Sequence, residues 1–452
     1  MTAFQQVSGD GRPGGPLLRE HTRMAVRRDP VQQHQRHHPV ALWFDDEEEV
    51  FSGSIVIDED GASGLGAPGA PVLVAIYTTM SKTRRRQAQS IAHSVDGGLI
   101  WVKHAGNPVL DRGSTDFRDP KVFRWDGDGP SYWVMVAVEA LERRVVFYRS
   151  EDLLRWESLS EFGPAGAVGG EWECPDLFPL RVEDSDRVRW VLLVSLNAGC
   201  VAGGSGTQYF VGDFDGVTFT AEHPETTRWL DYGRDCYAGV SFTGLPDADR
   251  TLIAWMNNWD YARQMPVDPA APQRGRMTLA RRLSLTDVDG DPRLRQVPVG
   301  PELREHARVD NLALDLGQEL DLPIPPAGRL DLAVDPGSAN GFAVELAGDD
   351  GSRVTVEYDA VAGVIHVDRR GAARGFPPAF AGVERMPVAR NAPIAITLWY
   401  DRHGLELFAE DGTRVLTDLT GALTPTLVRV GGRGGQIRIV ELAVSAAAPP
   451  SA

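Results

Sequence analysis

A short turn followed by an aromatic residue recurs along this chain and limits the folds that it can adopt. Residues 94–101 read SVDGGLIW, residues 150–156 read SEDLLRW, and a weaker copy, DFDGVTF, spans residues 213–219. The copies begin 56 and 63 residues apart. A turn that returns at this interval in a sequence without helical periodicity is typical of propeller blades of about four strands each.

Short runs of β-branched and aromatic residues surround these turns and predict strands. In the first part of the chain these runs cover residues 72–77, 121–125, 132–138, 144–149, 190–196, 208–213 and 251–256. After Pro301 the pattern changes to strict alternation, as in RVTVEY at 353–358, which favours half-buried antiparallel strands of a sandwich. This second series covers residues 330–334, 342–346, 353–358, 364–368, 394–400, 405–409, 414–416 and 436–444.

The predicted fold is therefore all-β, with a propeller over residues 40–300 and a sandwich over 301–452. The Pro-rich stretch LPIPP at 322–326 leaves the exact boundary open. Residues 1–39 are rich in Gly, Pro, Arg, Gln and His and lack periodic apolar positions, so we expect them to be disordered or the remnant of a degenerate first blade.

Composition narrows the class of partner. The 452 residues carry a formal net charge of −17, which disfavours nucleic acid and anionic membranes and suits a neutral carbohydrate. Three cysteines, Cys174, Cys200 and Cys236, show no paired spacing for disulfides or zinc, and we expect no metal or other cofactor. No apolar run approaches a membrane span or a signal-peptide core, so the printed sequence predicts a cytoplasmic protein.

Two acidic segments suggest carboxylate chemistry on a sugar. Residues 116–120 read DFRDP and residues 171–176 read EWECPD. Glu173 lies between Trp172 and a Cys-Pro pair, where burial would raise the pKa of its carboxyl and suit a general acid. Asp119 follows Arg118, whose charge is expected to keep that aspartate ionised and suited to binding sugar hydroxyls. The alternative, that each is an ordinary turn or strand residue, weakens because both occur on successive repeats of one propeller.

Several ordered motifs resemble those of glycoside hydrolase family 32, the group of invertases, inulinases and levanases. They are FSGS at 51–54, QSIA at 89–92, FRDPKVF at 117–123, WECPDLF at 172–178, GSGTQYF at 204–210 and WMNNW at 255–259. NGF at 340–342 and LELFA at 405–409 resemble the second domain of that family. The resemblance implies a five-bladed propeller, here with its first blade truncated or degenerate, followed by a β-sandwich. It also implies release of fructose from β-fructosides such as sucrose, levan or inulin, with retention of configuration.

The same resemblance assigns roles to individual residues. Glu173 corresponds to the general acid/base, Asp119 to the aspartate that stabilises the transition state, and Arg118 to a residue that orients both Asp119 and the substrate. The remaining positions that match walls of the fructose pocket are Phe51, Ser52, Glu171, Asp235, Tyr237 and Trp255. For Tyr237 and Trp255, ordinary packing inside a blade is an equally good explanation.

The family's nucleophile motif, an Asn-Asp-Pro-Asn-Gly sequence before FSGS, has no counterpart in the printed sequence. Asp10, Arg28-Asp29-Pro30 and the cluster His34, His37 and His38 are interpreted as chance or surface features. A truncated or frame-shifted N-terminus would explain the loss, and a secreted origin then stays open. We therefore expect impaired hydrolysis, and a noncatalytic fructan-binding protein or a fructosyltransferase remain alternatives.

Overall fold

A computed structural model describes residues 39–127, 129–266 and 276–447, together with the backbone of three two-residue strands nearer the N-terminus. The chain forms two compact units. The first comprises Met1–Leu196, Gln208–Arg228 and Val240–Arg250, and the second comprises Asn197–Thr207, Trp229–Gly239 and Thr251–Ala452. Within the described residues, no helix is both long and apolar enough to cross a membrane.

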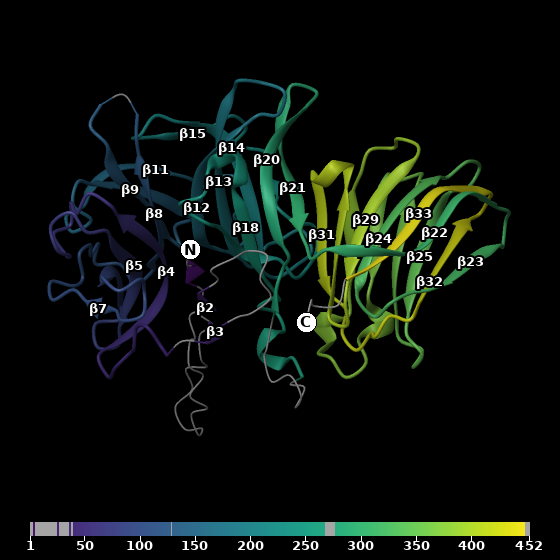
Figure 1. Cartoon of the computed structure of the whole chain (residues 1–452), viewed down its shortest axis with the longest axis horizontal. Helices are drawn as coiled ribbons and strands as arrows, with labels where there is room; N and C mark the ends of the chain where they lie inside the picture. Colours follow the sequence, from purple (N-terminus) through teal and green to yellow (C-terminus); the bar gives the residue numbers. More distant parts are fainter. Residues whose placement is uncertain are drawn as a thin grey trace. The chain divides into compact units, whose positions relative to one another are not determined.

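Four successive sheets have the up-and-down order of propeller blades, since most strands lie beside the next strand of the sequence (Figure 1). The first contains β4 (Glu48–Asp58), β5 (Val72–Ser81), β6 (Arg86–Ser94) and β7 (Val102–Lys103), with β1 (Ala3–Phe4) beside β4. The second contains β8 (Phe117–Trp125), β9 (Tyr132–Glu139), β10 (Arg144–Ser150) and β11 (Glu157–Phe162). The third contains β12 (Glu171–Arg181), β13 (Val188–Asn197), β14 (Gly206–Phe214), β15 (Phe219–Ala221) and β16 (Arg228–Trp229). The fourth contains β17 (Tyr237–Ser241), β18 (Thr251–Met256), β19 (Arg276–Met277), β20 (Ala280–Val288) and β21 (Asp291–Val299), and β2 (Ala25–Val26) pairs with β3 (Arg36–His37).

The recurring turn occupies the same place in three of these sheets, between the third and fourth strands. Asp96 Oδ1 accepts the N–H groups of Leu99 and Ile100 between β6 and β7. Asp152 and Asp215 accept the corresponding backbone N–H groups between β10 and β11 and between β14 and β15. An aspartate that binds backbone N–H groups two to four residues onward stabilises a turn without help from the rest of the protein. The sequence repeat therefore marks structurally equivalent blades.

The first long strands of the first three sheets lie side by side, because β8 contacts both β4 and β12. Each of the three is irregular at its motif, FSGS in β4, FRDP in β8 and ECPD in β12. The pairing of β4 with β5 shifts register between Val50 and Gly53, and that of β8 with β9 shifts between Arg118 and Lys121. On β12, Cys174 has a left-handed φ of 48°. Bulges of this kind redirect side chains, and they concentrate beside functional sites.

The C-terminal strands form two six-stranded sheets, as predicted for a sandwich (Figure 1). In β24 and β26, buried and partly exposed residues alternate, so one face of each sheet supplies the core. Leu330, Val344 and Val356 belong to one hydrophobic cluster that draws on both sheets. One sheet has the order β22 (Leu303–Leu314), β33 (Ile437–Ala447), β24 (Gly328–Asp335), β29 (Ile394–Tyr400), β30 (Gly404–Ala409) and β31 (Arg414–Leu419). The other has the order β23 (Glu319–Pro323), β32 (Leu427–Arg433), β25 (Gly341–Ala347), β26 (Arg353–Asp359), β27 (Val364–Asp368) and β28 (Val383–Pro387).

The all-β prediction is confirmed, and the described helices are five short 3₁₀ turns. These are η1 (Asp247–Asp249), η2 (Ala262–Gln264), η3 (Arg370–Ala372), η4 (Pro378–Phe380) and η5 (Glu410–Gly412). The change from blade-like to sandwich sheets falls between Val299 and Leu303. The Pro-rich stretch begins in β23, which ends at Pro323 and lies at the edge of its sheet, where a missing N–H is tolerated. The compact units follow a different division, since the second includes β18 to β21, and the predicted domain limits stay predictions.

Candidate active site

Arg118 holds together a cluster of carboxyl groups on the adjacent strands β8 and β12. Its Nη2 donates to Oε2 of Glu171 at 2.9 Å and to Oε1 of Glu173 at 3.1 Å. Its Nε lies 4.0 Å from Oδ2 of Asp119, and its Nη1 lies 3.6 Å from Oδ1 of Asp116. The two acidic segments that the sequence singled out therefore converge on one guanidinium.

The carboxyl of Glu173 lies in surroundings that suit a proton donor. Its side chain is 19% exposed, and burial raises its pKa from 4.5 to about 7. The negative charge of Asp119 adds to this rise, while Arg118 opposes it. A carboxyl that keeps its proton near neutral pH can deliver that proton to a leaving-group oxygen.

Asp119 departs from the expectation that Arg118 would keep its pKa low. The carboxyl is buried, and the loss of hydration raises its pKa more than Arg118 and the Cys174 hydrogen bonds lower it. The guanidinium lies at 4.0 Å from Asp119 and is shared with Glu171 and Glu173 at shorter distances. Sequence adjacency of Arg118 and Asp119 therefore overstated the strength of this pair.

The cluster has an excess of negative charge, because four carboxyl groups face one guanidinium. Such a site repels anionic ligands and favours a neutral polyol. It would also stabilise positive charge that develops on a sugar ring when a glycosidic bond breaks.

Phe51 and Ser52 lie at the bulge of β4, and both side chains are partly exposed. The neighbouring Ser54 accepts the backbone N–H of Val122 through its Oγ at 3.0 Å, which fastens β4 to β8. The bulge thus displaces Phe51 and Ser52 from regular pairing on a strand that borders the one carrying Arg118 and Asp119.

The other predicted wall residues belong to the second unit and are packed inside it. Tyr237 and Trp255 are 3% and 7% exposed, with ring centroids 6.2 Å apart. Asp235 is fully buried and ion-pairs with Arg369, and one of its oxygens accepts the N–H of Leu419 at 2.9 Å. The Tyr261 hydroxyl donates to the other oxygen of Asp235. Asp235 is better explained as a structural residue than as a ligand for sugar hydroxyls.

Sequence reasoning missed three polar residues near Asp119, of which two bond it directly and one bonds it through Thr78. Cys174 donates its backbone N–H to Oδ2 of Asp119 at 2.9 Å, and its Sγ lies 3.7 Å away. Thr78 accepts the Asp119 N–H, and Gln89 accepts the hydroxyl of Thr78. Gln89 belongs to the QSIA motif, and Cys174 directly follows Glu173. Both positions were therefore marked by motifs, but the sequence did not show that they bond the residues around Asp119.

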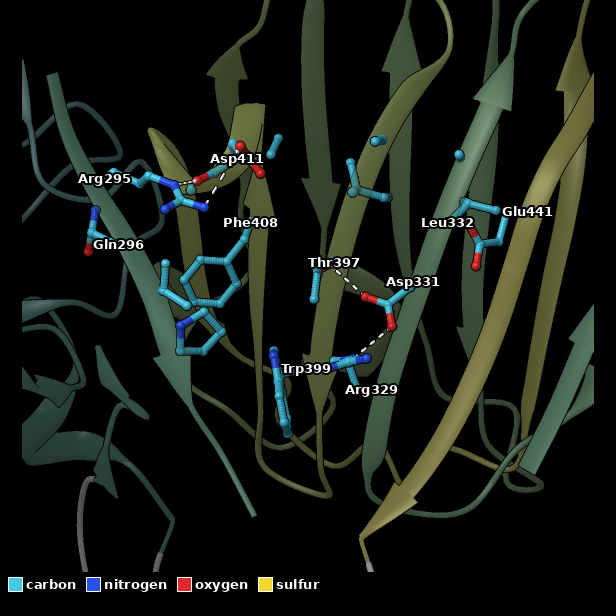
Figure 2. A pocket seen from close by; sticks show the side chains of 17 residues that line it. Arg295, Gln296, Arg329, Asp331, Leu332, Thr397, Trp399, Phe408, Asp411 and Glu441 are labelled. Carbon is cyan, nitrogen blue, oxygen red and sulfur yellow. Dashed lines mark hydrogen bonds and ion pairs between the residues drawn. The ribbon is translucent and has the colours of Figure 1, made fainter. Parts of the chain in front are cut away.

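A separate cavity of about 390 Å³ lies within the second unit and contains none of the predicted site residues (Figure 2). Asp331 on its wall is already paired with Arg329 at 2.7 Å and accepts the Thr397 hydroxyl at 2.8 Å. Arg295 donates to the backbone oxygen of Asp411 at 2.8 Å. Because these groups are hydrogen-bonded to one another, the cavity presents few free polar groups to a ligand.

The structure bears only in part on the N-terminal features and on metal-ligating groups. The N-terminal features Asp10, Arg28-Asp29-Pro30, His34, His37 and His38 involve side chains outside the described residues. Where side chains are described, no group of three or more His, Cys, Asp or Glu residues is arranged to hold a metal ion.

Two family models match successive parts of the chain. Residues 27–298 match the model for the N-terminal domain of glycosyl hydrolases family 32, and residues 302–420 match the model for its C-terminal domain. A levanase from Bacillus subtilis is 38% identical over 439 residues, which cover 92% of this chain. The chain spans only 62% of that levanase's length.

Solved structures agree with the fold. The crystal structure of an exo-inulinase from Aspergillus awamori is 30% identical, with a TM-score of 0.84 and coverage of 97% of this chain and 92% of that one. The fructofuranosidase from Schwanniomyces occidentalis, solved in complex with fructose, is 27% identical with a TM-score of 0.83. That alignment covers 94% of this chain and 89% of the fructofuranosidase chain.

Proposed function

Since this chain belongs to glycosyl hydrolase family 32, we propose that its carboxylate cluster is a β-fructosidase site for sucrose, levan or inulin. The observation that carries the proposal is the protonatable Glu173, which shares Arg118 with Asp119 and has a pKa of about 7. The levanase, exo-inulinase and fructofuranosidase relatives support this class of substrate.

In the proposed reaction, Glu173 protonates the glycosidic oxygen, and the bond from that oxygen to the fructosyl anomeric carbon breaks. The leaving sugar departs as an alcohol while positive charge spreads over the fructosyl ring, and attack at the anomeric carbon by a carboxylate nucleophile and then by water completes the release of fructose. Asp119 would bind ring hydroxyls and stabilise that charge, and Arg118 would orient both carboxyl groups. Phe51 and Ser52 would contact the fructosyl unit from β4, and Glu171 would border it from β12.

We also propose that the printed chain hydrolyses poorly. A retaining reaction needs a carboxylate nucleophile to form the glycosyl-enzyme intermediate. The printed sequence contains no Asn-Asp-Pro-Asn-Gly motif to supply it. Binding of the fructosyl unit does not require that covalent step, so fructose should still bind.

The test combines calorimetry with an assay of fructose release from sucrose, levan and inulin. We expect fructose binding that Arg118→Met weakens, together with release far below ordinary enzyme rates of about 10 s⁻¹. A folded sample that binds no fructose or fructan contradicts the assigned site. Release at ordinary rates that Glu173→Ala abolishes would instead contradict the proposed impairment. Product analysis on any residual activity separates hydrolysis from fructosyl transfer.

A further inference from the structure

At the bulge of β8, the backbone N–H of Asp119 finds its hydrogen-bond acceptor in the neighbouring sheet. Arg118 pairs with Val138 of β9, and Lys121 pairs with Val136, so Asp119 and Pro120 both stand opposite one residue. Asp119 adopts a left-handed φ of 61°, which is unfavourable for a residue with a side chain. Its buried N–H has no place in the β8–β9 ladder and needs another acceptor.

Thr78 on β5 supplies that acceptor. The Asp119 N–H donates to Thr78 Oγ1 at 3.0 Å, and the Thr78 hydroxyl donates to Gln89 Oε1 at 3.0 Å. Gln89 Nε2 then donates to the backbone oxygen of Phe117 at 2.9 Å. The bonds run from residue 119 through the adjacent sheet and return to residue 117, so they hold Asp119 inside the bulge and Phe117 just before it.

The side chains of Thr78 and Gln89 are themselves fixed by the surrounding sheet. Thr78 and Gln89 are opposite one another in the β5–β6 pair, and both are fully buried. The backbone of Gln89 also bonds residues 109 and 110 on its other side. A fixed rotamer on a rigid strand is what precise placement of a site carboxylate requires.

We infer that Thr78 and Gln89 are positioning residues for Asp119, which hold its backbone in the left-handed conformation that directs the carboxylate toward the fructosyl unit. The inference rests on the proposed function of the site. Without the Thr78 hydroxyl, the Asp119 N–H would be buried and unpaired, and the backbone would relax toward an extended conformation. The Asp119 carboxylate would then lose the hydrogen bond of 2.9 Å that it accepts from the Cys174 N–H.

The decisive variant is Thr78→Val, which keeps the shape of the side chain and removes the hydroxyl. Thr78→Ser keeps the hydroxyl and serves as the rescue. Thr79→Val is the matched control, because Thr79 is buried on the same strand and bonds Ser90 and Ala88 rather than Asp119. Circular dichroism first establishes that each full-length variant is folded.

Two measurements then distinguish a role in positioning Asp119 from a general contribution to the packing of the strand. By calorimetry, fructose should bind Thr78→Val about tenfold more weakly than wild type, while Thr78→Ser and Thr79→Val stay within about threefold. By carboxyl NMR, the pKa of Glu173 should fall by about half a pH unit in Thr78→Val only, because the Asp119 charge that raises it has moved away.

The titration needs no sugar, so it judges the inference even if wild type fails to bind fructose and the proposed function is abandoned. If Thr78→Val does not fold, Gln89→Met replaces it, since it removes the bonds that orient Thr78 and hold Phe117. A folded variant whose Glu173 titrates as in wild type would overturn the inference, and so would an equal loss of affinity in Thr79→Val.

Discussion

The backbone N–H of Cys174 donates a hydrogen bond of 2.9 Å to Oδ2 of Asp119 and thereby joins β12 to β8. Both residues have left-handed φ angles, 48° for Cys174 and 61° for Asp119. Because Glu173 directly precedes Cys174, this one bond relates the proposed acid to the proposed stabiliser through main-chain geometry. The left-handed backbone at Asp119 and Cys174 thus fixes part of this relationship, and the side chain of Arg118 fixes the rest.

The raised pKa of Glu173 predicts a stability that falls as pH rises. Between the ordinary value of 4.5 and the folded value of about 7, the folded protein keeps a proton that the unfolded chain has lost. Unfolding then releases a proton, so increasing pH favours the unfolded state. Glu173→Gln has no charge to bury and should escape this loss.

We therefore expect Glu173→Gln to gain roughly 2 to 3 kcal/mol over wild type between pH 4.5 and pH 8. Urea unfolding at several pH values measures the difference. Equal pH dependence in the two proteins would contradict the assigned pKa. Glu157→Gln, on the exposed strand β11, is the control and should follow wild type at every pH.

Sequence reasoning reached the strands that contain strong β-formers, including residues 121–125 of β8, and missed two other strands at the site. Residues 251–256, 364–368 and 394–400 were predicted with the bounds that the structure gives. In contrast, β4 and β12 were not predicted as strands, because FSGS and ECP interrupt them with small residues, charges and a proline. The residues that make these strands irregular are the ones that carry the chemistry.

The order of motifs located Arg118, Asp119 and Glu173, but tertiary burial determined their electrostatics. Adjacency suggested a low pKa for Asp119, whereas the structure divides Arg118 among several carboxyl groups and removes water from Asp119. Nor could spacing reveal that Asp235 pairs with Arg369, which lies 134 residues away in the chain. Such long-range pairing depends on contacts that no local pattern encodes.

Asp235 provides a test of structural against substrate-binding roles. Asp235→Asn weakens the buried pair with Arg369 and should lower the free energy of unfolding by about 3 kcal/mol. The fructose affinity of the folded variant should stay unchanged, because Tyr261, Arg369 and the Leu419 N–H already occupy both carboxylate oxygens of Asp235. Calorimetry under conditions where the variant is folded measures this affinity. A tenfold weaker affinity without a change in stability would restore Asp235 to the fructose pocket.

Lys121 on β8 and Asp176 on β12 form a buried ion pair. The losses of unfolding free energy caused by replacing each residue should therefore not add. Lys121 Nζ donates to Asp176 Oδ2 at 3.2 Å and to the backbone oxygen of Ser241 at 2.5 Å. Lys121→Met leaves the fully buried Asp176 without its cation and should cost about 3 kcal/mol. The double variant Lys121→Met/Asp176→Asn should recover part of that loss, and additive losses in a double-mutant cycle would contradict the coupling.

Arg118 should matter more for stability as the carboxyl groups around it ionise. Arg118→Met removes a guanidinium that compensates Glu171, Glu173 and Asp119, so at pH 7 we expect the free energy of unfolding to fall by about 3 kcal/mol. At pH 4 the loss should shrink, because protonated carboxyls no longer repel one another. Arg149→Met is the matched control, since Arg149 pairs with Glu157 on an exposed surface and its removal should leave stability unchanged at both pH values. Chemical unfolding of wild type and the two variants measures these differences. If Arg118→Met loses the same free energy of unfolding at pH 4 and pH 7, then Arg118 stabilises the protein mainly through packing and not through charge compensation.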